Sequence, residues 1–550
     1  MSDRSYSENR RTLLKTVGVA LGAVGGAGQV ATADRAERRR SGFEAWTGVR
    51  LGPNRTGATD DRGPTPFPAT DWRTDLEGSM YDVEPVVAGE TVYLAVTSDN
   101  GPGEQEGYVG AYDGRTGDRR WKRSDLPATK TPSLGDGTLY VVTRDYETSG
   151  AEEAGVYALD ARSGDIEWTR LQQPHCTTPV VADDRVYLAN ERGAFALDPD
   201  TGDTVWHAED VGGIAERAEG ALSYADGTVF FSDGTALDAD TGSVEWEVDD
   251  DAILGNNVAG DERVYFVRTD YVDGDDDEVR VEARSMADGR VEWTHDEMNE
   301  RDGRLALADG RLFLLDSSDD SSVVKALDAD TGTVTWTRTT SGKLRSDPTV
   351  ADGTVYVGGW YAPTSADRES RALVDASSAS TGRRKWAYLL DSDGLATSPE
   401  NPPAAGTPAV VDGRLYIATY PGESTLDYRY VRYSNFHALR SADRRPGEEC
   451  RPPADPPGDD RCPAVEACID AMPDLDSCGL EPGDAIELDA SCSAGRELGY
   501  EWDTDGDGRY DEFGSCVRVT VPDCGSVTVR LGVTDARGRT DATAVTIPSE

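Results

Sequence analysis

The stretch ALDADTGSVEW (236–246) recurs ninety residues later as ALDADTGTVTW (326–336), with changes only at its eighth and tenth positions. A catalytic motif normally occurs once for each active site, whereas a recurring stretch describes a structural repeat. Its general form is aliphatic-x-Asp-x-x-Thr/Ser-Gly-x-x-x-Trp, and eight copies, with erosion, lie between residues 111 and 447. The last copy, ALRSADRRPG (438–447), lacks the tryptophan.

Each copy follows a turn and an alternating apolar run, such as DGTVYVG (352–358) or DGRLYIA (412–418). The alternation and the β-branched and aromatic content predict strands. In the Asp-x-x-Thr-Gly element, aspartate can bond the backbone two residues on, and glycine supplies the positive φ of a tight hairpin. The tryptophan that follows can fill the space against a neighbouring sheet. No helix is predicted in 70–440.

The spacing of the tryptophans indicates the architecture. Intervals of 38 to 50 residues match four short strands with their turns, which is one propeller blade. Trp72 has no turn before it, and the eighth turn has no tryptophan after it, so the N-terminal segment is predicted to complete the last blade. This closure would remove exposed sheet edges. The predicted docking residues are Trp72, Trp121, Trp168, Trp206, Trp246, Trp293, Trp336 and Trp386.

The motif resembles the PQQ-enzyme repeat of quinoprotein alcohol dehydrogenases and of the outer-membrane assembly scaffold lipoprotein of Gram-negative bacteria. The resemblance covers about 46–447 and implies an all-β fold, an eight-bladed PQQ-like propeller over 46–440. Dehydrogenases of this family carry a disulfide between adjacent cysteines, a calcium site and a catalytic aspartate. This propeller contains one cysteine, Cys176, and no segment matches those ligands. We therefore expect no catalytic and no cofactor-binding residue, and no bound PQQ.

Other residues of the propeller give weaker signals. The histidines at 175, 207, 295 and 437 share no metal-ligand spacing. His175 and Cys176 are adjacent, so on a strand they face opposite sides and we interpret Cys176 as a buried structural residue. Trp46 and Trp360 either line a channel or fill irregular gaps. The acidic stretch at 270–280 is a solvated hairpin tip or a loose cation site.

The composition changes at the C-terminal end of the propeller. The proline-rich, charged segment 441–463 predicts a linker. Seven of the eight cysteines then lie within 450–524, a density that implies disulfides in an exported protein. Zinc is the alternative, but paired Cys-x2-Cys spacings and nearby histidines are missing. Because seven is odd, one thiol is expected to stay free or to pair between chains.

The module at 464–550 is similar to a PKD-type, immunoglobulin-like β-sandwich. Tyr500–Gly508 matches that family's Trp-Asp-Phe-Gly-Asp-Gly stretch, with the phenylalanine replaced and a longer loop. The resemblance implies a non-catalytic spacer or adhesion module. The same stretch follows the first half of a calcium loop, with Asp503, Asp505, Asp507 and Asp511 as candidate ligands. The terminal bidentate glutamate is missing, so an unliganded acidic turn is the alternative.

The charge of the chain is strongly acidic. It has 103 Asp and Glu against 55 Lys and Arg, a net charge of −48, and the acidic residues occur in almost every predicted turn. This pattern resembles secreted proteins of salt-loving archaea, where molar salt shortens the Debye length to about 3 Å and screens the repulsion. An ordinary acidic secreted protein is the alternative. A nucleic-acid partner is not expected, because binding phosphates needs a basic face.

The N-terminus predicts export. Arg10 and Arg11 precede a modest apolar run, and Ala31-Thr32-Ala33 follows it, which resembles a twin-arginine (Tat) signal over 1–33. The weak hydrophobicity of the run predicts no integral membrane span in the mature chain, with an uncleaved signal anchor as the alternative. The protein is therefore expected to be extracellular or cell-surface associated.

Together these features predict an exported, non-catalytic scaffold that recognises a protein or a cell-surface polymer. Two other functions stay open at the sequence level. One is a PQQ-dependent dehydrogenase, which the repeat resembles. The other is carbohydrate-binding adhesion through the PKD-like module. No cofactor is expected apart from calcium in that module.

Overall fold

The computed structural model contains only β-structure among the residues it describes, which confirms the all-β prediction. The predicted signal (1–33) and linker (441–463, apart from 441–442) lie outside those residues. The described residues are 45–65, 67–101, 104–143, 153–172, 176–190, 192–209, 211, 222–248, 253–270, 278–298, 305–317, 322–340, 343–361, 370–398, 401–422, 433–442, 467–472, 485–490, 493, 498–506, 510, 512–522, 526–534 and 540–548.

The described residues of 45–442 form eight sheets, which we number one to eight in the chain order of their main strands. In sheets one to four, consecutive strands pair antiparallel. Their strands are, in sheet one, β1 (Ala45–Trp46), β4 (Val86–Ala88), β5 (Thr91–Gly101), β6 (Glu104–Asp113) and β7 (Arg119–Pro127); in sheet two, β8 (Ser133–Gly135), β9 (Thr138–Val142), β10 (Gly155–Asp160) and β11 (Ile166–Leu171); in sheet three, β12 (Val180–Ala182), β13 (Arg185–Asn190), β14 (Gly193–Leu197) and β15 (Thr204–Ala208); and in sheet four, β16 (Leu222–Ala225), β17 (Thr228–Phe231), β18 (Thr235–Asp238) and β19 (Val244–Glu247).

Sheets five and six repeat this pattern, whereas sheets seven and eight also receive strands from the N-terminal segment. Their strands are, in sheet five, β20 (Ile253–Ala259), β21 (Arg263–Asp270), β22 (Glu278–Ser285) and β23 (Val291–Met298); in sheet six, β24 (Ala306–Ala308), β25 (Arg311–Ser317), β26 (Ser322–Asp328) and β27 (Val334–Thr339); in sheet seven, β2 (Ala58–Thr59), β28 (Lys343–Leu344), β29 (Thr349–Ala351), β30 (Thr354–Tyr361), β31 (Arg371–Ser378) and β32 (Arg384–Leu389); and in sheet eight, β3 (Phe67–Asp75), β33 (Pro403–Ala405), β34 (Ala409–Val411), β35 (Arg414–Pro421) and β36 (Asn435–Ala442).

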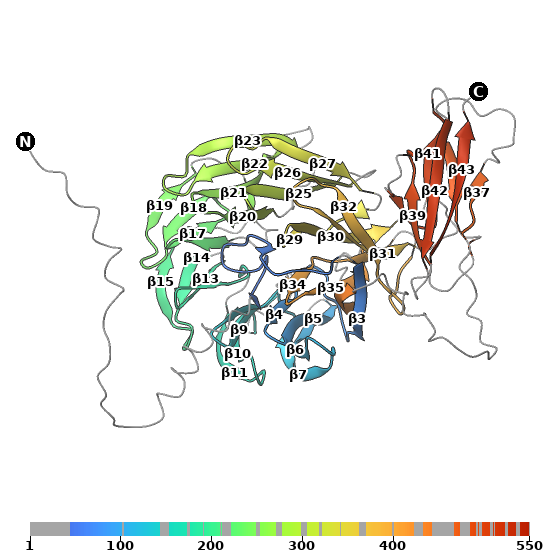
Figure 1. Cartoon of the computed structure of the whole chain (residues 1–550). Coiled ribbons are helices and arrows are strands. Elements are labelled where there is room, and N and C mark those ends of the chain that lie inside the picture. Colours follow the sequence, from blue (N-terminus) through green and yellow to red (C-terminus); the bar gives the residue numbers. More distant parts are fainter. Residues whose placement is uncertain are drawn as a thin grey trace, which may run out of the picture. The chain divides into compact units, whose positions relative to one another are not determined.

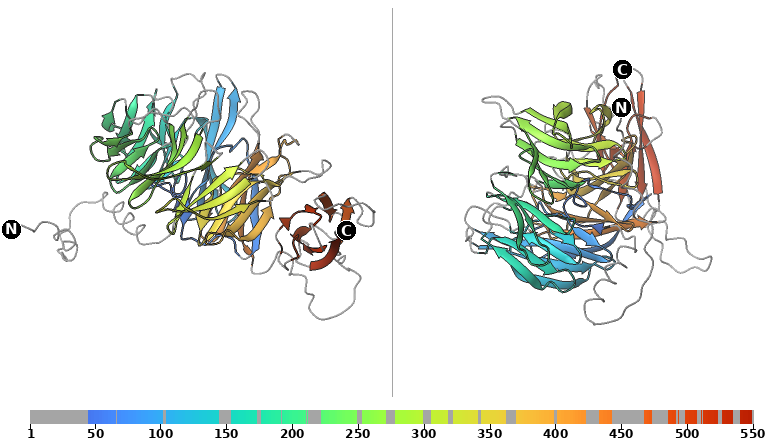
Figure 2. Two further views of the ribbon diagram at one scale, coloured as in Figure 1. Left: turned by 90° about the horizontal axis from the view of Figure 1, so that it is seen from above. Right: turned by 90° about the vertical axis from the view of Figure 1, so that its left-hand side faces the viewer.

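The eight sheets are arranged around a common centre, as in a β-propeller (Figure 1). The first main strand of each sheet faces this centre, because such strands contact their counterparts in neighbouring sheets, as β12 does with β8 and β16. The middle strands are buried almost throughout, whereas outer strands such as β11 alternate between half-buried and exposed residues. Figure 2 shows the same stacking of sheets from two further directions. The core therefore lies between the sheets.

The short turn between the first and second strands explains the recurrent Asp-Gly in the sequence. At Asp136-Gly137 the φ angles are 46° and 92°, and at Asp226-Gly227 they are 48° and 87°. Two successive positive φ values define a type I′ hairpin, whose twist matches that of the flanking strands. Aspartate tolerates this conformation and glycine adopts it without strain, so the dipeptide fixes a tight hairpin at this point.

The stretch ALDADTGSVEW (236–246) forms the second hairpin of sheet four, between β18 and β19. Asp238 Oδ1 accepts a hydrogen bond from Thr241 N at 2.8 Å, and Gly242 N donates to Asp238 O at 2.8 Å. The register shifts between Ala236 and Leu237, as in a β-bulge. The Asp-x-x-Thr-Gly motif is therefore a side-chain-capped turn that leads the chain into the outer strand.

The antiparallel order gives the ring two unlike faces. Both hairpin turns of sheets one to seven, such as 136–137 and 160–164 in sheet two, emerge on one face, which we call the turn face. The connections between second and third strands, and those from one sheet to the next, emerge on the opposite face, which we call the loop face. The turn face is built from short, rigid hairpins, so longer surface segments are confined to the loop face.

Sheet eight joins the two ends of the ring. Its outer strand β3 comes from the N-terminal segment and pairs antiparallel with β36, with Phe67 opposite Ala442 and Asp75 opposite Asn435. The sequence predicted that the N-terminal segment completes the last sheet, because Trp72 has no turn before it. A register shift between Thr70 and Trp72 marks a bulge, which leaves Asp71 opposite no residue.

The described C-terminal residues form two further sheets around a separate hydrophobic core. One sheet has the order β37-β38-β41 and the other β40-β39-β42-β43. Trp502, Ile486 and Leu531 are fully buried in this core. The strands are β37 (Asp470–Met472), β38 (Ala485–Asp489), β39 (Gly499–Asp503), β40 (Glu512–Phe513), β41 (Cys516–Thr520), β42 (Ser526–Thr534) and β43 (Thr540–Pro548).

Candidate functional site

The eight predicted docking tryptophans all lie on outer strands, and each indole Nε1 donates a hydrogen bond to a backbone carbonyl of the next sheet. The donor–acceptor distances are 2.8–3.1 Å. The pairs are Trp72–Gly114, Trp121–Ala161, Trp168–Pro199, Trp206–Ala239, Trp246–Met286, Trp293–Ala329, Trp336–Ala379 and Trp386–Pro64.

These bonds join the sheets into a cycle. Sheet one donates to sheet two, and so on until Trp386 of sheet seven reaches Pro64, just before β3 of sheet eight. Trp72 on β3 then returns to Gly114 of sheet one. At seven of the eight contacts the glycine of the next turn lies flat on the indole: a Cβ on Gly202, at φ 72°, would come within 2.6 Å of Trp168. Glycine is therefore required for this contact as well as for the turn.

The centre of the ring is filled by the chain's own N-terminal segment, residues 45–61, which we call the hub segment. Its blue trace crosses the middle of the sheets in Figure 1. β1 pairs with β4 of sheet one, and β2 pairs in parallel with β29 of sheet seven. Its backbone carbonyls also accept hydrogen bonds from the innermost strands at Thr47–Leu134, Pro53–Tyr224, Asn54–Ala259, Thr56–Leu307 and Gly57–Val350.

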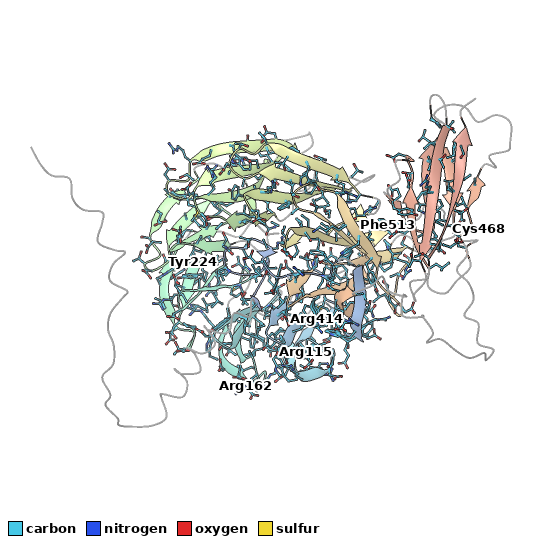
Figure 3. The ribbon with its side chains drawn as sticks, viewed as in Figure 1. Arg115, Arg162, Tyr224, Arg414, Cys468 and Phe513 are labelled. Carbon is cyan, nitrogen blue, oxygen red and sulfur yellow. The ribbon has the colours of Figure 1, made fainter. Side chains whose placement is uncertain are left out.

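Two buried arginines extend the hub segment into the remaining space; both side chains are 2% exposed. Arg55 donates to the carbonyls of Leu222, Thr178 and Pro179, at 3.1–3.3 Å, and so reaches sheets three and four. Arg50 donates to the carbonyls of Leu305 and Pro348, ahead of the inner strands of sheets six and seven. Tyr224, two residues after Leu222 on β16, is labelled in Figure 3. The two guanidinium groups therefore tie the hub segment to sheets three, four, six and seven, whose residues lie more than a hundred positions away in the chain.

A buried carboxylate accompanies these cations. Glu84, which is 3% exposed, accepts a hydrogen bond from the backbone N–H of Arg50 at 2.8 Å. Its own N–H donates to Thr131 Oγ1 at 3.0 Å. Sequence reasoning did not identify Arg50, Arg55 or Glu84, because none of them belongs to the repeat. The carbonyls that the two guanidinium groups bind in the sheets lie more than a hundred residues away.

The cavity beside the hub arginines is too small for a quinone. The cavity lined by Arg50, Arg55, Asn257 and their neighbours has a volume of about 10 Å³, enough for roughly one water molecule. Cys176, the one cysteine of the propeller sequence, is 1% exposed and contacts Asn190, so no adjacent pair is available. Within the described residues, no group of three or more His, Cys, Asp or Glu side chains could hold a metal ion.

The histidines do not converge. His175 lies outside the described residues, while His207, His295 and His437 belong to β15, β23 and β36, in three different sheets. His207 stacks on Phe195 with ring centroids 4.2 Å apart. His437 is fully buried, and this burial lowers its pKa to about 4, with a further contribution from the Arg73 charge. At neutral pH it is therefore an uncharged core residue.

Two aromatic contacts lie on the loop face of sheets seven and eight. Tyr81 and Tyr420 meet edge to face at 5.5 Å, and both are half-buried. Gly422 lies next to Trp360, so that an added Cβ would be 3.5 Å from the ring. The exposed Arg345 guanidinium covers the same ring at 5.4 Å. We call Tyr81, Tyr420, Trp360 and Arg345 the loop-face cluster.

Trp360 was one of two propeller tryptophans that the repeat did not explain. It is 3% exposed, and Trp46 on β1 is fully buried in sheet one. Both therefore fill internal space, which is one of the two interpretations left open by the sequence. The acidic stretch of 270–280 lies largely outside the described residues.

Half of the candidate calcium ligands can be placed. Asp503 at the end of β39 is 1% exposed, and its Oδ1 accepts a hydrogen bond from Gly506 N at 2.8 Å. Asp505 is exposed on the same turn. Asp507 and Asp511 lie outside the described residues. Asp503 therefore caps a tight turn at the end of β39, and Asp505 lies within that turn.

A family comparison identifies the repeats. The family model described as outer membrane protein assembly factor BamB matches residues 105–249, 196–303 and 275–426, more than half of the 550-residue chain. The chain belongs to this family. The BamB family match covers most of the ring, from sheet one to sheet eight. A search of curated proteins finds no match.

Solved structures with similar folds include a BamB protein and two dehydrogenases. BamB from Moraxella catarrhalis is 18% identical, with 68% of this chain and 97% of that chain covered and a TM-score of 0.47. Quinohemoprotein alcohol dehydrogenase from Comamonas testosteroni is 13% identical, with 74% and 83% covered and a TM-score of 0.49. A europium-containing methanol dehydrogenase is 14% identical, with 74% and 100% covered and a TM-score of 0.49.

Membership of the BamB family agrees with the repeat motif that the sequence analysis used. The described residues contain no helix that could cross a membrane.

Proposed function

We propose that this protein is an exported, non-catalytic scaffold, an eight-bladed propeller that recognises a partner through its loop face. The observation that carries the proposal is the filled hub. Arg50, Arg55 and the rest of the hub segment occupy the centre of the ring, and a cavity of about 10 Å³ remains beside them. The cycle of eight indole hydrogen bonds supports the count of eight blades.

The loop-face cluster supports the location of the recognition surface. Tyrosine, tryptophan and arginine are the residues that dominate binding energies at protein interfaces. Tyr81 and Tyr420 are half-buried and Arg345 is exposed, so they combine a fixed position with an accessible edge. The family description as an assembly factor favours a protein partner over a cell-surface polymer.

The rest of the proposed organisation follows the sequence. A Tat signal over 1–33 directs the folded chain outside the cell, and a linker over 441–463 joins the propeller (46–440) to a PKD-like module (464–550). Disulfides among the seven cysteines of 450–524 stabilise that module. Calcium binds at Asp503, Asp505, Asp507 and Asp511, and its removal by a chelator would lower the module's melting temperature.

A capture experiment tests the recognition surface. The full chain, immobilised in high salt, is mixed with solubilised native cell surface, and bound proteins are identified. Replacing Tyr81 and Arg345 by alanine is expected to reduce capture of the partner at least about tenfold, because hot-spot residues each contribute more than a kilocalorie. Arg162→Ala, on an exposed turn of the turn face, is the matched control. Equal loss in both variants would contradict the proposed surface.

Reconstitution tests the dehydrogenase alternative. The purified protein is incubated with PQQ and calcium, and bound quinone and dye reduction are measured. We expect neither a stoichiometric quinone spectrum nor alcohol-dependent dye reduction. A bound quinone at one equivalent would overturn the non-catalytic proposal.

A further inference from the structure

The contact between sheets seven and eight is built differently from the other seven contacts around the ring. In those seven, a glycine of an Asp-x-x-Thr/Ser-Gly type turn lies flat on the indole of the preceding sheet. Sheet eight has no such hairpin, because β36 ends at Ala442 and its outer strand β3 begins at Phe67. Residues 62–65 take the place of the turn, and Trp386 donates to Pro64 O at 2.8 Å.

A groove remains where the hairpin is replaced. It has a volume of about 430 Å³ and is lined by Arg62, Gly63, Thr65, Asp352, Thr354 and Lys385, which we call the closure groove. This volume lies within the range of small-molecule sites. Gly63 forms part of its wall, and an added Cβ there would meet the Tyr356 hydroxyl at 2.3 Å. A larger residue at position 63 would clash with Tyr356, so glycine is required in this part of the groove wall.

The residue before the docking tryptophan is acidic in some sheets and basic in others: it is Arg120 in sheet one, which donates to Thr91 Oγ1, and Lys385 in this groove. The residue before the docking tryptophan is Glu167 in sheet two, where its carboxylate accepts a hydrogen bond from Thr138 Oγ1 at 2.9 Å. Glu245 makes the same bond with Thr228 in sheet four. In sheet seven the residue is Lys385. Its ammonium donates to Thr354 Oγ1 at 2.6 Å and Gly353 O at 3.1 Å.

The ammonium of Lys385 is therefore positioned by two bonds, and its third N–H is left for a ligand. Arg62, another lining residue, is paired with Asp352 at 3.2 Å, and the two side chains are 75% and 53% exposed. An exposed pair of this kind is weak and can be rearranged by a competing anion. The lining residues carry two cations and one carboxylate, in a chain where acidic residues outnumber basic ones by 103 to 55.

We propose that the closure groove binds a small organic carboxylate that carries hydroxyl groups, such as a sugar acid. A single carboxylate matches the single net positive charge of the lining, whereas a phosphate dianion would be repelled by Asp352. Lys385 and Arg62 provide charge-assisted donors for the carboxylate. Asp352 and Thr65 provide acceptors for the hydroxyl groups of the ligand. This site is on the turn face and is independent of the partner proposed for the loop face.

Titration of the full chain with glucuronate tests the proposal, with glucose as the neutral control and potassium chloride held constant. Calorimetry is expected to give saturable binding of glucuronate at one site and none of glucose. Lys385→Gln is expected to weaken glucuronate binding about tenfold or more, because it removes a charge-assisted hydrogen bond. Lys385→Arg keeps the charge and should retain binding. Arg162→Gln removes one positive charge from an exposed turn of sheet two and should leave binding unchanged (Figure 3).

Three results would overturn the proposal: no saturable binding to the wild-type chain, binding of glucose as tight as that of glucuronate, or equal weakening by Lys385→Gln and Arg162→Gln. Melting temperatures of all variants are measured first, so that loss of fold is distinguished from loss of the site. Partner capture by Lys385→Gln should be normal, which separates this site from the loop-face proposal.

Discussion

The indole of Trp206 combines two contributions to stability. Its side chain is 8% exposed, it lies 6.0 Å from the Tyr187 ring, and its Nε1 donates to Ala239 O. We expect Trp206→Ala to lower the free energy of unfolding by about 3–5 kcal/mol, as for other buried tryptophans. Trp206→Phe, which loses only the N–H and part of the ring, should cost less.

Denaturation in high salt measures both changes. Val205→Ala on the same strand is the control, because Val205 is 41% exposed and should change stability by less than about 0.5 kcal/mol. An equal effect of Trp206→Ala and Val205→Ala would contradict the docking role.

His437 predicts a pH dependence of stability. Burial lowers its pKa to about 4 from the ordinary value of 6.5, so the unfolded chain binds this proton more readily than the folded one. Between pH 4 and 6.5 stability therefore rises with pH, and outside this window His437 contributes no slope. His437→Gln should remove about 3 kcal/mol of pH dependence across the window. Denaturation midpoints at several pH values give the difference, and identical slopes in both proteins would contradict it.

The roles of single residues could be predicted from the sequence where the residues belong to the repeat, and not where they lie outside it. The docking tryptophans follow a motif of eleven residues, so their role could be inferred without a structure. Arg50 and Arg55 belong to no repeated motif, and their guanidinium groups bind carbonyls of sheets three, four, six and seven. Their conformation is also unusual, with φ values of 55° and 59°. Such backbone conformations persist where the surrounding structure holds them, here through local bonds such as Arg55 N to Gly52 O and through the long-range bonds of the guanidinium groups.

Strand β3 is fixed to sheet eight by charge as well as by backbone bonds. Asp71, at the bulge, accepts hydrogen bonds from Arg414 Nε at 3.1 Å and Arg440 Nε at 2.9 Å, and it is 18% exposed. We expect Asp71→Asn to destabilise the protein by about 1–3 kcal/mol, because it weakens two charge-assisted bonds. Arg414 is labelled in Figure 3.

Glu90→Gln is the matched control for Asp71→Asn. Glu90 pairs with Arg115 at 2.7 Å, with side chains 53% and 60% exposed, so its loss should cost less than about 1 kcal/mol. Thermal unfolding compares the two variants. A larger effect of Glu90→Gln would contradict the importance of the bonds from Arg414 and Arg440 to Asp71.

The elements differ in how visible they are from sequence. The second strand and both hairpins of a sheet follow from apolar alternation, Asp-Gly and Asp-x-x-Thr-Gly, because local chemistry determines them. β1 and β2 have two residues each, and β2 pairs in parallel with β29. A parallel pair of this length has no local signal, since its register is set by the ring around it.

The hub segment is expected to stabilise the whole ring. A chain that begins at residue 45 keeps the hub, whereas one that begins at residue 62 loses it but retains β3. The shorter chain loses at least five buried backbone hydrogen bonds and should melt at least about 10 °C lower, or fail to fold. Circular dichroism and gel filtration in high salt compare the two chains, and equal melting temperatures would contradict the role of the hub.

The pairing of β3 with β36 sets the order in which the molecule can be assembled. Asp71 and Arg440 are 369 positions apart, so the earliest strand of sheet eight waits until nearly the whole ring has been synthesised. Until then the nascent protein carries an unmatched strand, and the barrier to folding includes the entropy of a very long loop. Because the hub segment precedes that strand, the last sheet must be completed around a centre already occupied.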